Sequence, residues 1–268
     1  MKHIKYIIFT MLASLSFSCT KEKLNDSMHE TPLGGVLNAD KTPRLVNPFE
    51  ELGIFHNAAL DYEAKQNDFP RLTEERIYDL LYPFINRKYP CVKWSNDQLK
   101  AFHDQNEQLV NAGSNATTIL AQEGKIDKMT KELLDELYAI VFYGSEPELT
   151  LTPLQMNERV GTFEQNVMRK YGVPAATLTP GTSVGIVLGA ASIARNSYKY
   201  WYEALHDIGN PWYDVLRGDS TKNKINWRNV WMTIKADFLG FCGHCGDGNG
   251  GINLVTGVEG AIDESASV

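Results

Sequence analysis

The sequence predicts an all-α fold, an irregular bundle of about seven helices with a glycine-rich C-terminal tail. Three observations favour it. Apolar residues recur at spacings of three and four, which places them on one face of a helix. Residues that favour helix starts alternate regularly with glycines that favour helix ends. Sustained runs of alternating β-branched residues, which are typical of strands, do not occur.

The first two predicted helices have recognisable starts. Asn47 is suited to cap a helix that runs to about Gln66, with Pro48 at its first position. Thr73 caps the second helix, and Pro83 is expected to kink or end it because proline has no amide N–H to donate.

The next two helices repeat the pattern. Ser95 and Gln98 form a capping box for the third helix, and Gly113 is placed to stop it. Thr130 opens the fourth helix and Gly144 closes it. Each carries leucines or other apolar residues on one face, so each should pack against the core.

The last three helices complete the predicted domain. Residues 152–155, with Thr152 followed by a proline, give the clearest start in the chain, and Gly172 marks the end of that helix. A longer helix spans about 182–206 and is apolar nearly all round over 184–194, which predicts a central, buried position. Asn226 caps a final helix over 227–239.

The N-terminus resembles a bacterial lipoprotein export signal. Lys2 and Lys5 precede an apolar stretch of roughly 11 residues, whereas a membrane-spanning helix needs about 20. Ser18 then precedes Cys19, the position at which lipoproteins are cut and acylated. The expected mature protein therefore begins at a lipidated Cys19. Ser16 and Ser18 also fit an ordinary cleavage site, which would release the chain without lipid.

These features divide the chain into four parts. Residues 1–18 are the expected signal peptide, 19–46 the lipidated N-terminus and flexible tether, 47–240 the helical domain and 241–268 the glycine-rich tail. The predicted location is the cell envelope, anchored by lipid and expected at the outer membrane.

Composition limits the partners. Removing residues 1–18 takes away two lysines and no acids, so the formal net charge changes from −7 to −9. An acidic chain without basic runs is not expected to bind nucleic acid. The expected partner is the membrane, through the N-terminal lipid, together with a protein or glycan that the sequence does not identify. No cofactor is expected.

Three short stretches form recognisable motifs: residues 53–61 (GIFHNAALD), 191–201 (ASIARNSYKYW) and 235–237 (KAD). Together they resemble a group of exported proteins and lipoproteins from Bacteroidota without an assigned activity. The resemblance implies an exported location and a helical fold.

Cys242 and Cys245 enclose the sequence Gly-His, which gives a Cys-x-x-Cys motif shared with disulfide oxidoreductases. A thioredoxin fold would need further strands and a helix after this motif, and the glycine-rich tail does not supply them. We therefore predict a local structural disulfide between the two cysteines. A metal site with His244 is the alternative, although a fourth ligand is not evident. With Cys19 lipidated, three cysteines remain, so one of them stays unpaired or finds an external partner, and a cross-link to Cys91 is a further alternative.

Ser183 lies in a Gly-x-Ser-x-Gly sequence, the pattern of a hydrolase nucleophile elbow. Asp214 or Asp219, followed by His244, would give the order of serine, acid and histidine found in such enzymes. The preceding segment, with two prolines, does not fit the buried strand that an elbow requires. A position at the start of a helix is the simpler explanation of Ser183.

Four residues are candidates for a binding surface. Consecutive rings cannot all face inward, so Trp201, Tyr202 and Trp212 are expected to include exposed aromatics that bind a glycan or peptide. His56 is a further candidate, as a ligand or a base, although a buried, hydrogen-bonded histidine is the more common arrangement.

The predicted function is that of a cell-envelope lipoprotein with a non-enzymatic binding or structural role. We assign no catalytic and no metal-binding residues. The alternative is a secreted enzyme, with a serine hydrolase site at Ser183 or a thiol or metal site at Cys242 and Cys245. A third possibility is a membrane-active glycine-rich tail.

Overall fold

The computed structural model describes residues 45–66, 74–88, 96–142, 149–171, 182–217, 225 and 227–244. Within these ranges the chain is all-α, as the sequence predicts, and contains no strand. The longer helices are α3 (Glu50–Ala64), α4 (Glu74–Lys88), α5 (Asn96–Ala112), α7 (Lys128–Val141), α8 (Pro153–Lys170), α9 (Ser183–His206) and α11 (Trp227–His244). Two shorter helices, α6 (Ala116–Gln122) and α10 (Trp212–Arg217), and the 3-10 turn η1 (Gly113–Asn115) complete the described fold.

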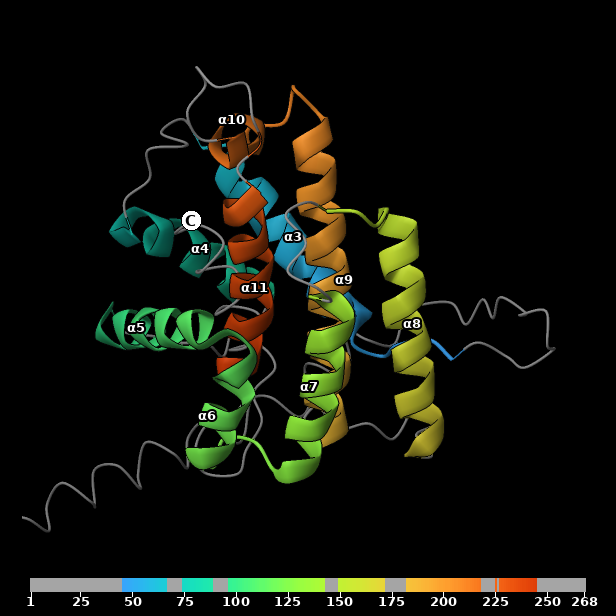
Figure 1. Ribbon diagram of the computed structural model, residues 1–268. Helices are drawn as coiled ribbons and strands as arrows, with labels where there is room; N and C mark the ends of the chain where they lie inside the picture. Colours follow the sequence, from blue (N-terminus) through green and yellow to red (C-terminus); the bar gives the residue numbers. More distant parts are fainter. Residues whose placement is uncertain are drawn as a thin grey trace, which may run out of the picture.

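Helix α9 is the centre of the bundle. It packs against α3, α7, α8, α10 and α11, and Figure 1 shows these helices around it. Its residues 184–194 are all buried, which confirms the central position predicted from their apolar character. The Thr182 side chain caps it by accepting a hydrogen bond from the Gly185 amide at 3.2 Å. α5 lies across α11 and contacts it, while α10 lies beside the C-terminal end of α9 (Figure 1).

Several predicted helix ends agree with the structure. Thr152 and Gln155 form the predicted capping box at the start of α8, with both reciprocal hydrogen bonds present. α5 ends at Ala112, and Gly113 follows with a φ of 57°, a left-handed conformation that glycine adopts without strain.

The predicted first cap is wrong. α3 begins at Glu50, and its N-cap position is Phe49, which makes no side-chain cap. Asn47 instead accepts a hydrogen bond from the Phe49 amide at 2.9 Å and forms a turn before the helix. The Asn47 side chain also donates to Glu164 at 2.7 Å and to the Leu188 carbonyl at 2.8 Å, so it lies in the turn that precedes the helix.

Pro83 neither ends nor interrupts α4, which continues to Lys88. Pro83 is exposed, so water can satisfy the carbonyl that its missing N–H leaves free.

α7 starts three residues earlier than predicted: its cap is Asp127, whose carboxylate accepts from the Thr130 amide at 2.7 Å. Thr130 therefore receives the cap and does not provide it.

α11 continues to His244, beyond the predicted end at residue 239, because Phe241 and Cys242 extend its buried face. α6 and α10 were not predicted. The predicted caps Thr73, Ser95 and Asn226, the stops Gly144 and Gly172, and the predicted signal, tether and tail up to Arg44 and from Cys245 lie outside the described residues. Among the helices described, none is both long and apolar enough to cross a membrane.

Candidate functional site

The stretches 53–61, 191–201 and 235–237 meet in space where α3, α9 and α11 pack together. We call the polar side chains buried there the three-helix junction. Its members, listed by helix, are His56 of α3, Ser197 and Trp201 of α9 and Asp237 of α11. All four are at most 1% exposed. The junction thus brings together a histidine, a serine and an aspartate, which are residue types capable of acid, base or nucleophilic chemistry.

Asp237 is the central residue of the junction. Its Oδ2 accepts hydrogen bonds from the Ser197 hydroxyl and, at 2.8 Å, from the indole N–H of Trp201. Its Oδ1 lies 3.4 Å from Nε2 of His56. Hydrogen bonds from α9 and an ion-pair contact with α3 therefore surround one buried carboxylate on α11, which offsets the cost of removing it from water.

His56 is held at both ring nitrogens. Nδ1 lies 2.9 Å from Oδ1 of Asn57, while Nε2 faces Asp237. The amide nitrogen of Asn57 donates to the backbone carbonyl of Asn196 at 3.0 Å, which fixes the orientation of the Asn57 side chain. The ring is thus positioned by α3, α9 and α11 together. Asp61, which lies on the same helix, contacts the Tyr200 hydroxyl at 3.0 Å.

A second polar cluster, centred on Arg195, joins α9 to α3 and α8. The Arg195 guanidinium pairs with Glu50 and, at 3.3 Å from Nε, with Glu164. It also donates to Oδ1 of Asn157 at 2.9 Å. Asn47 donates to Glu164 at 2.7 Å, which connects the start of the domain to the same cluster. Paired and hydrogen-bonded in this way, these charges hold three helices in register.

The geometry of the junction differs from that of a catalytic triad. In a serine hydrolase the histidine lies between serine and acid and takes the serine proton. Here the acid lies between Ser197 and His56, and its carboxylate accepts the hydroxyl proton in a hydrogen bond. A serine held in this way is not activated as a nucleophile. Full burial also denies a substrate access to these atoms.

The structure buries three of the four residues named as candidates for a binding surface. His56 and Trp201 are completely buried and Trp212 is 4% exposed. The rings of Trp201 and Trp212 pack edge to face with centroids 5.2 Å apart, so both belong to the core. Tyr202 is partly exposed and stacks on the His206 ring at 4.2 Å.

Ser183 is the first residue of α9, and its hydroxyl donates to Oδ2 of Asp127 at 2.8 Å. Asp214 lies in α10, beyond the other end of α9 (Figure 1). Because 24 helical residues span about 36 Å, Ser183 and Asp214 cannot belong to one triad. Asp219 and the His244 side chain lie outside the described residues.

Asp127 joins the starts of two helices. Partial burial acts to raise its pKa, but hydrogen bonds from Thr130 and Ser183 outweigh this and lower the pKa below its ordinary value of 3.8. The carboxylate caps α7 and also holds the first residue of α9. This accounts for Ser183 as a structural residue at a helix start.

Cys242 is fully buried within α11 and forms no disulfide with another residue that the structure describes. Burial raises the pKa of this thiol well above its ordinary value, so it stays protonated and is a poor nucleophile. The predicted partner Cys245 lies outside the described residues, so the disulfide stays a prediction. Within the described part of the chain no three potential ligands gather as a metal site.

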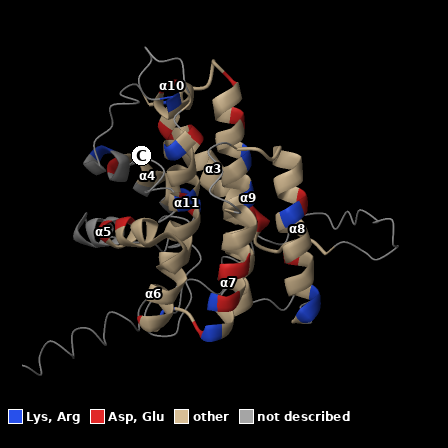
Figure 2. Ribbon diagram, in the orientation of Figure 1, with Lys and Arg blue, Asp and Glu red and all other residues tan. Residues whose placement is uncertain are grey.

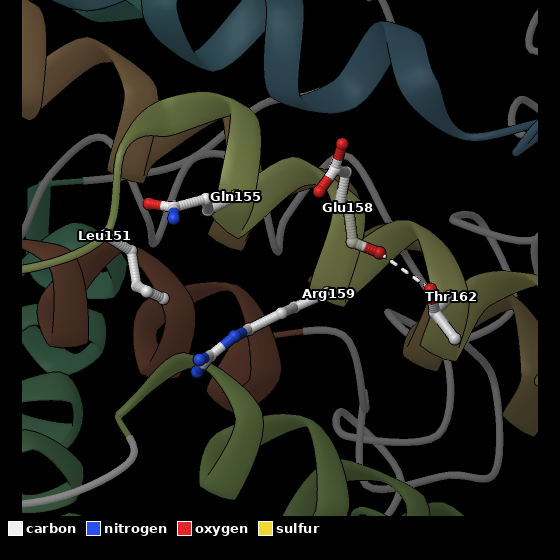
Figure 3. A pocket seen from close by; sticks show the side chains of 5 residues that line it. All are labelled: Leu151, Gln155, Glu158, Arg159 and Thr162. Carbon is white, nitrogen blue, oxygen red and sulfur yellow. Dashed lines mark hydrogen bonds between the residues drawn. The ribbon is translucent and has the colours of Figure 1, made fainter.

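A shallow surface pocket of about 240 Å³ lies beside the start of α8. Its lining residues are Leu151, Gln155, Glu158, Arg159 and Thr162 (Figure 3). The side chains of Glu158 and Arg159 point to opposite sides in this view, and the Thr162 hydroxyl donates to the Glu158 backbone carbonyl at 2.8 Å. Neither His56 nor Ser183 lines this pocket.

Asp237, Ser197 and Asn57 were not singled out from the sequence as site residues. The usable clue was a polar residue within an apolar helical run, as Asp237 is between Ala236 and Phe238. A carboxylate in such a position must find donors when the helix packs.

Figure 2 shows Lys and Arg interspersed with Asp and Glu along the described helices.

Comparison of the chain with protein-family models, with curated proteins and with solved structures found no match.

Proposed function

We propose that the chain is an exported protein of the cell envelope, anchored by lipid at Cys19, whose helical domain has a binding or structural role without catalysis. In this proposal the membrane is reached through the lipid and nucleic acid is not a partner. The partner of the domain is a protein or glycan.

The proposal of a role without catalysis rests on the burial and the contacts of the three-helix junction. His56, Ser197 and Asp237 are residues suited to acid, base or nucleophilic chemistry, and all three are buried, with Ser197 hydrogen-bonded to Asp237 and Nε2 of His56 3.4 Å from the same carboxylate. Catalytic groups need contact with a substrate. Their arrangement instead fits residues that fix the packing of three helices.

The entry of the chain into the domain supports a tethered role. The side-chain amide of Gln165 accepts from the Leu45 amide at 2.9 Å and donates to the Leu45 carbonyl at 2.5 Å. Two residues later Asn47 bonds to Glu164 and, at 2.8 Å, to the Leu188 carbonyl. Residues 45–47 are thus fixed to α8 and α9. These hydrogen bonds would resist a pull from the linker at the start of the domain.

The anchor is tested with wild type and Cys19→Ala in cells labelled with a fatty-acid analogue. The wild type is expected to carry the label and to sediment with membranes, and the Cys19→Ala variant to lose both properties. Release of unlabelled wild-type protein would contradict the lipid anchor.

The absence of catalysis has its own test. A fluorophosphonate probe for serine hydrolases is applied to the wild type and to Ser183→Ala, and insulin reduction is assayed with the wild type and Cys242→Ala/Cys245→Ala. Neither activity is expected. Labelling lost on Ser183→Ala, or insulin reduction lost in the double variant, would establish the enzyme alternative.

A further inference from the structure

We propose that His56 and Asp237 share one proton between Nε2 and Oδ1, and that the packing of α3, α9 and α11 weakens when alkaline conditions remove it. The inference starts from the protons that the hydrogen bonds require. It concerns a pH response of the helical domain and does not depend on the lipid anchor.

The first step assigns Nδ1 of His56. Asn57 donates its amide nitrogen to the Asn196 carbonyl, so the atom that faces the ring is the amide oxygen, at 2.9 Å. An amide oxygen only accepts hydrogen bonds. Nδ1 must therefore carry a proton.

The second step concerns Nε2, which faces Oδ1 of Asp237 at 3.4 Å. Without a proton between them, a nitrogen lone pair would face a carboxylate oxygen in a site with no exposure to water. With one proton there, the pair has no net charge, whether the proton is on the ring or on the carboxyl. Oδ2 already accepts from Ser197 and Trp201, so only Oδ1 remains for the histidine.

The other ion pairs and charged contacts described on the packed helices join different residues. Glu63, the other buried acid of α3, lies seven residues, or about 10 Å, further along the helix. The remaining pairs are Arg195 with Glu50 and Glu164, Lys88 with Glu51, Lys199 with Glu203, Asp61 with Tyr200, Arg87 with the rings of Tyr62 and Phe84, and Lys235 with the ring of Phe142. Asp237 is thus the charged group that contacts His56 from α11.

Proton linkage gives the direction of the effect. Above about pH 6.5 the unfolded histidine has lost its proton while the folded pair retains one, so stability falls as pH rises. For one proton the unfolding equilibrium constant increases about tenfold per pH unit. Below about pH 4 the unfolded chain also protonates the aspartate, and stability falls in the acid direction. The junction therefore favours a mildly acidic to neutral environment.

Asp237→Asn is the informative variant. The asparagine oxygen can accept from Ser197 and Trp201 while its amide donates to Nε2, so every hydrogen bond remains with a neutral histidine. The alkaline loss should then disappear. Stability should instead fall below about pH 6.5, because only the unfolded chain binds the extra proton.

The experiment measures urea unfolding of the full mature chain from about pH 5 to 9 for the wild type, Asp237→Asn and His56→Gln. NMR of ring nitrogens follows His56 over the same pH range. The expected result is an alkaline loss in the wild type that both variants lack, with no titration of His56 near pH ~6.5. If the variants fail to fold, the wild-type spectra decide alone. An ordinary His56 titration, or wild-type and variant pH profiles that run parallel, would overturn the proposal.

Discussion

Gly53 of α3 lies directly against Ser192 of α9. The Gly53 amide donates to the Ser192 hydroxyl at 3.2 Å, and that hydroxyl donates in turn to the Glu50 carbonyl at 3.0 Å. A Cβ added at Gly53 would lie 2.5 Å from the Ser192 backbone carbonyl. The absence of a side chain at residue 53 therefore sets the distance between the two helices that carry most of the junction.

Gly53→Ala should destabilise the domain although alanine is the better helix former. Because the obstructing atom is backbone, α3 or α9 must shift, and overpacking of this kind costs about 1–3 kcal/mol. Urea unfolding measures the change in the free energy of unfolding.

Ala58→Gly on the exposed face of α3 is the matched control, with an expected loss of about 1 kcal/mol from helix propensity alone. Stabilisation by Gly53→Ala would show that the two helices are not in close contact at this point.

Asp127→Asn should reduce the loss of stability in acid. The folded-state pKa of Asp127 is lowered, so its contribution is present above pH 3.8 and is lost as pH falls through the lowered value. Asparagine caps helices about as well as aspartate but does not titrate.

The measurement is the free energy of unfolding at pH 7 and near pH ~3, with the wild type expected to lose more than the variant. Equal losses would mean that Asp127 does not contribute to the acid response.

Local sequence patterns predicted where the helices lie better than they predicted which helices pack together. The capping box at Thr152 and Gln155 depends on residues three apart, so the sequence displays it directly. At α7 both Asp127 and Thr130 are good caps, and the choice depended on where the helix packs. α10 has six residues, which is too short for an apolar repeat to be visible.

The junction could be predicted only in part. The stretches with His56, Ser197 and Asp237 were identified as short motifs, but the sequence does not show that they meet, because the residues are distant along the chain. The sequence predicted that some of the adjacent aromatics would be exposed but not which ones: Trp201 and Trp212 are buried and Tyr202 is partly exposed. Long-range packing supplied information that spacing lacks.

Gln165→Ala should release the start of the domain from α8. Leu45 would lose both of its backbone hydrogen bonds to this side chain. Faster hydrogen exchange at the Leu45 amide and faster proteolysis around it are expected, with a global loss of about 1–2 kcal/mol for the two bonds.

Asn166→Ala, at the exposed neighbouring position of the same helix, provides the control and should change neither property. If hydrogen exchange at the Leu45 amide were unchanged in Gln165→Ala, the Gln165 side chain would not be what holds Leu45 against α8.

The most direct test of a structural junction is the free energy of unfolding of Asp237→Ala, with Asp61→Ala as the control. Removing the buried carboxylate leaves Ser197, Trp201 and His56 without their acceptor, and losing one partner of a buried charged network costs about 3–5 kcal/mol. Asp61 is exposed and bonds only Tyr200 among the contacts described, so its removal should cost under about 1 kcal/mol. The account predicts this large difference between the two variants. An Asp237→Ala protein as stable as Asp61→Ala would contradict it.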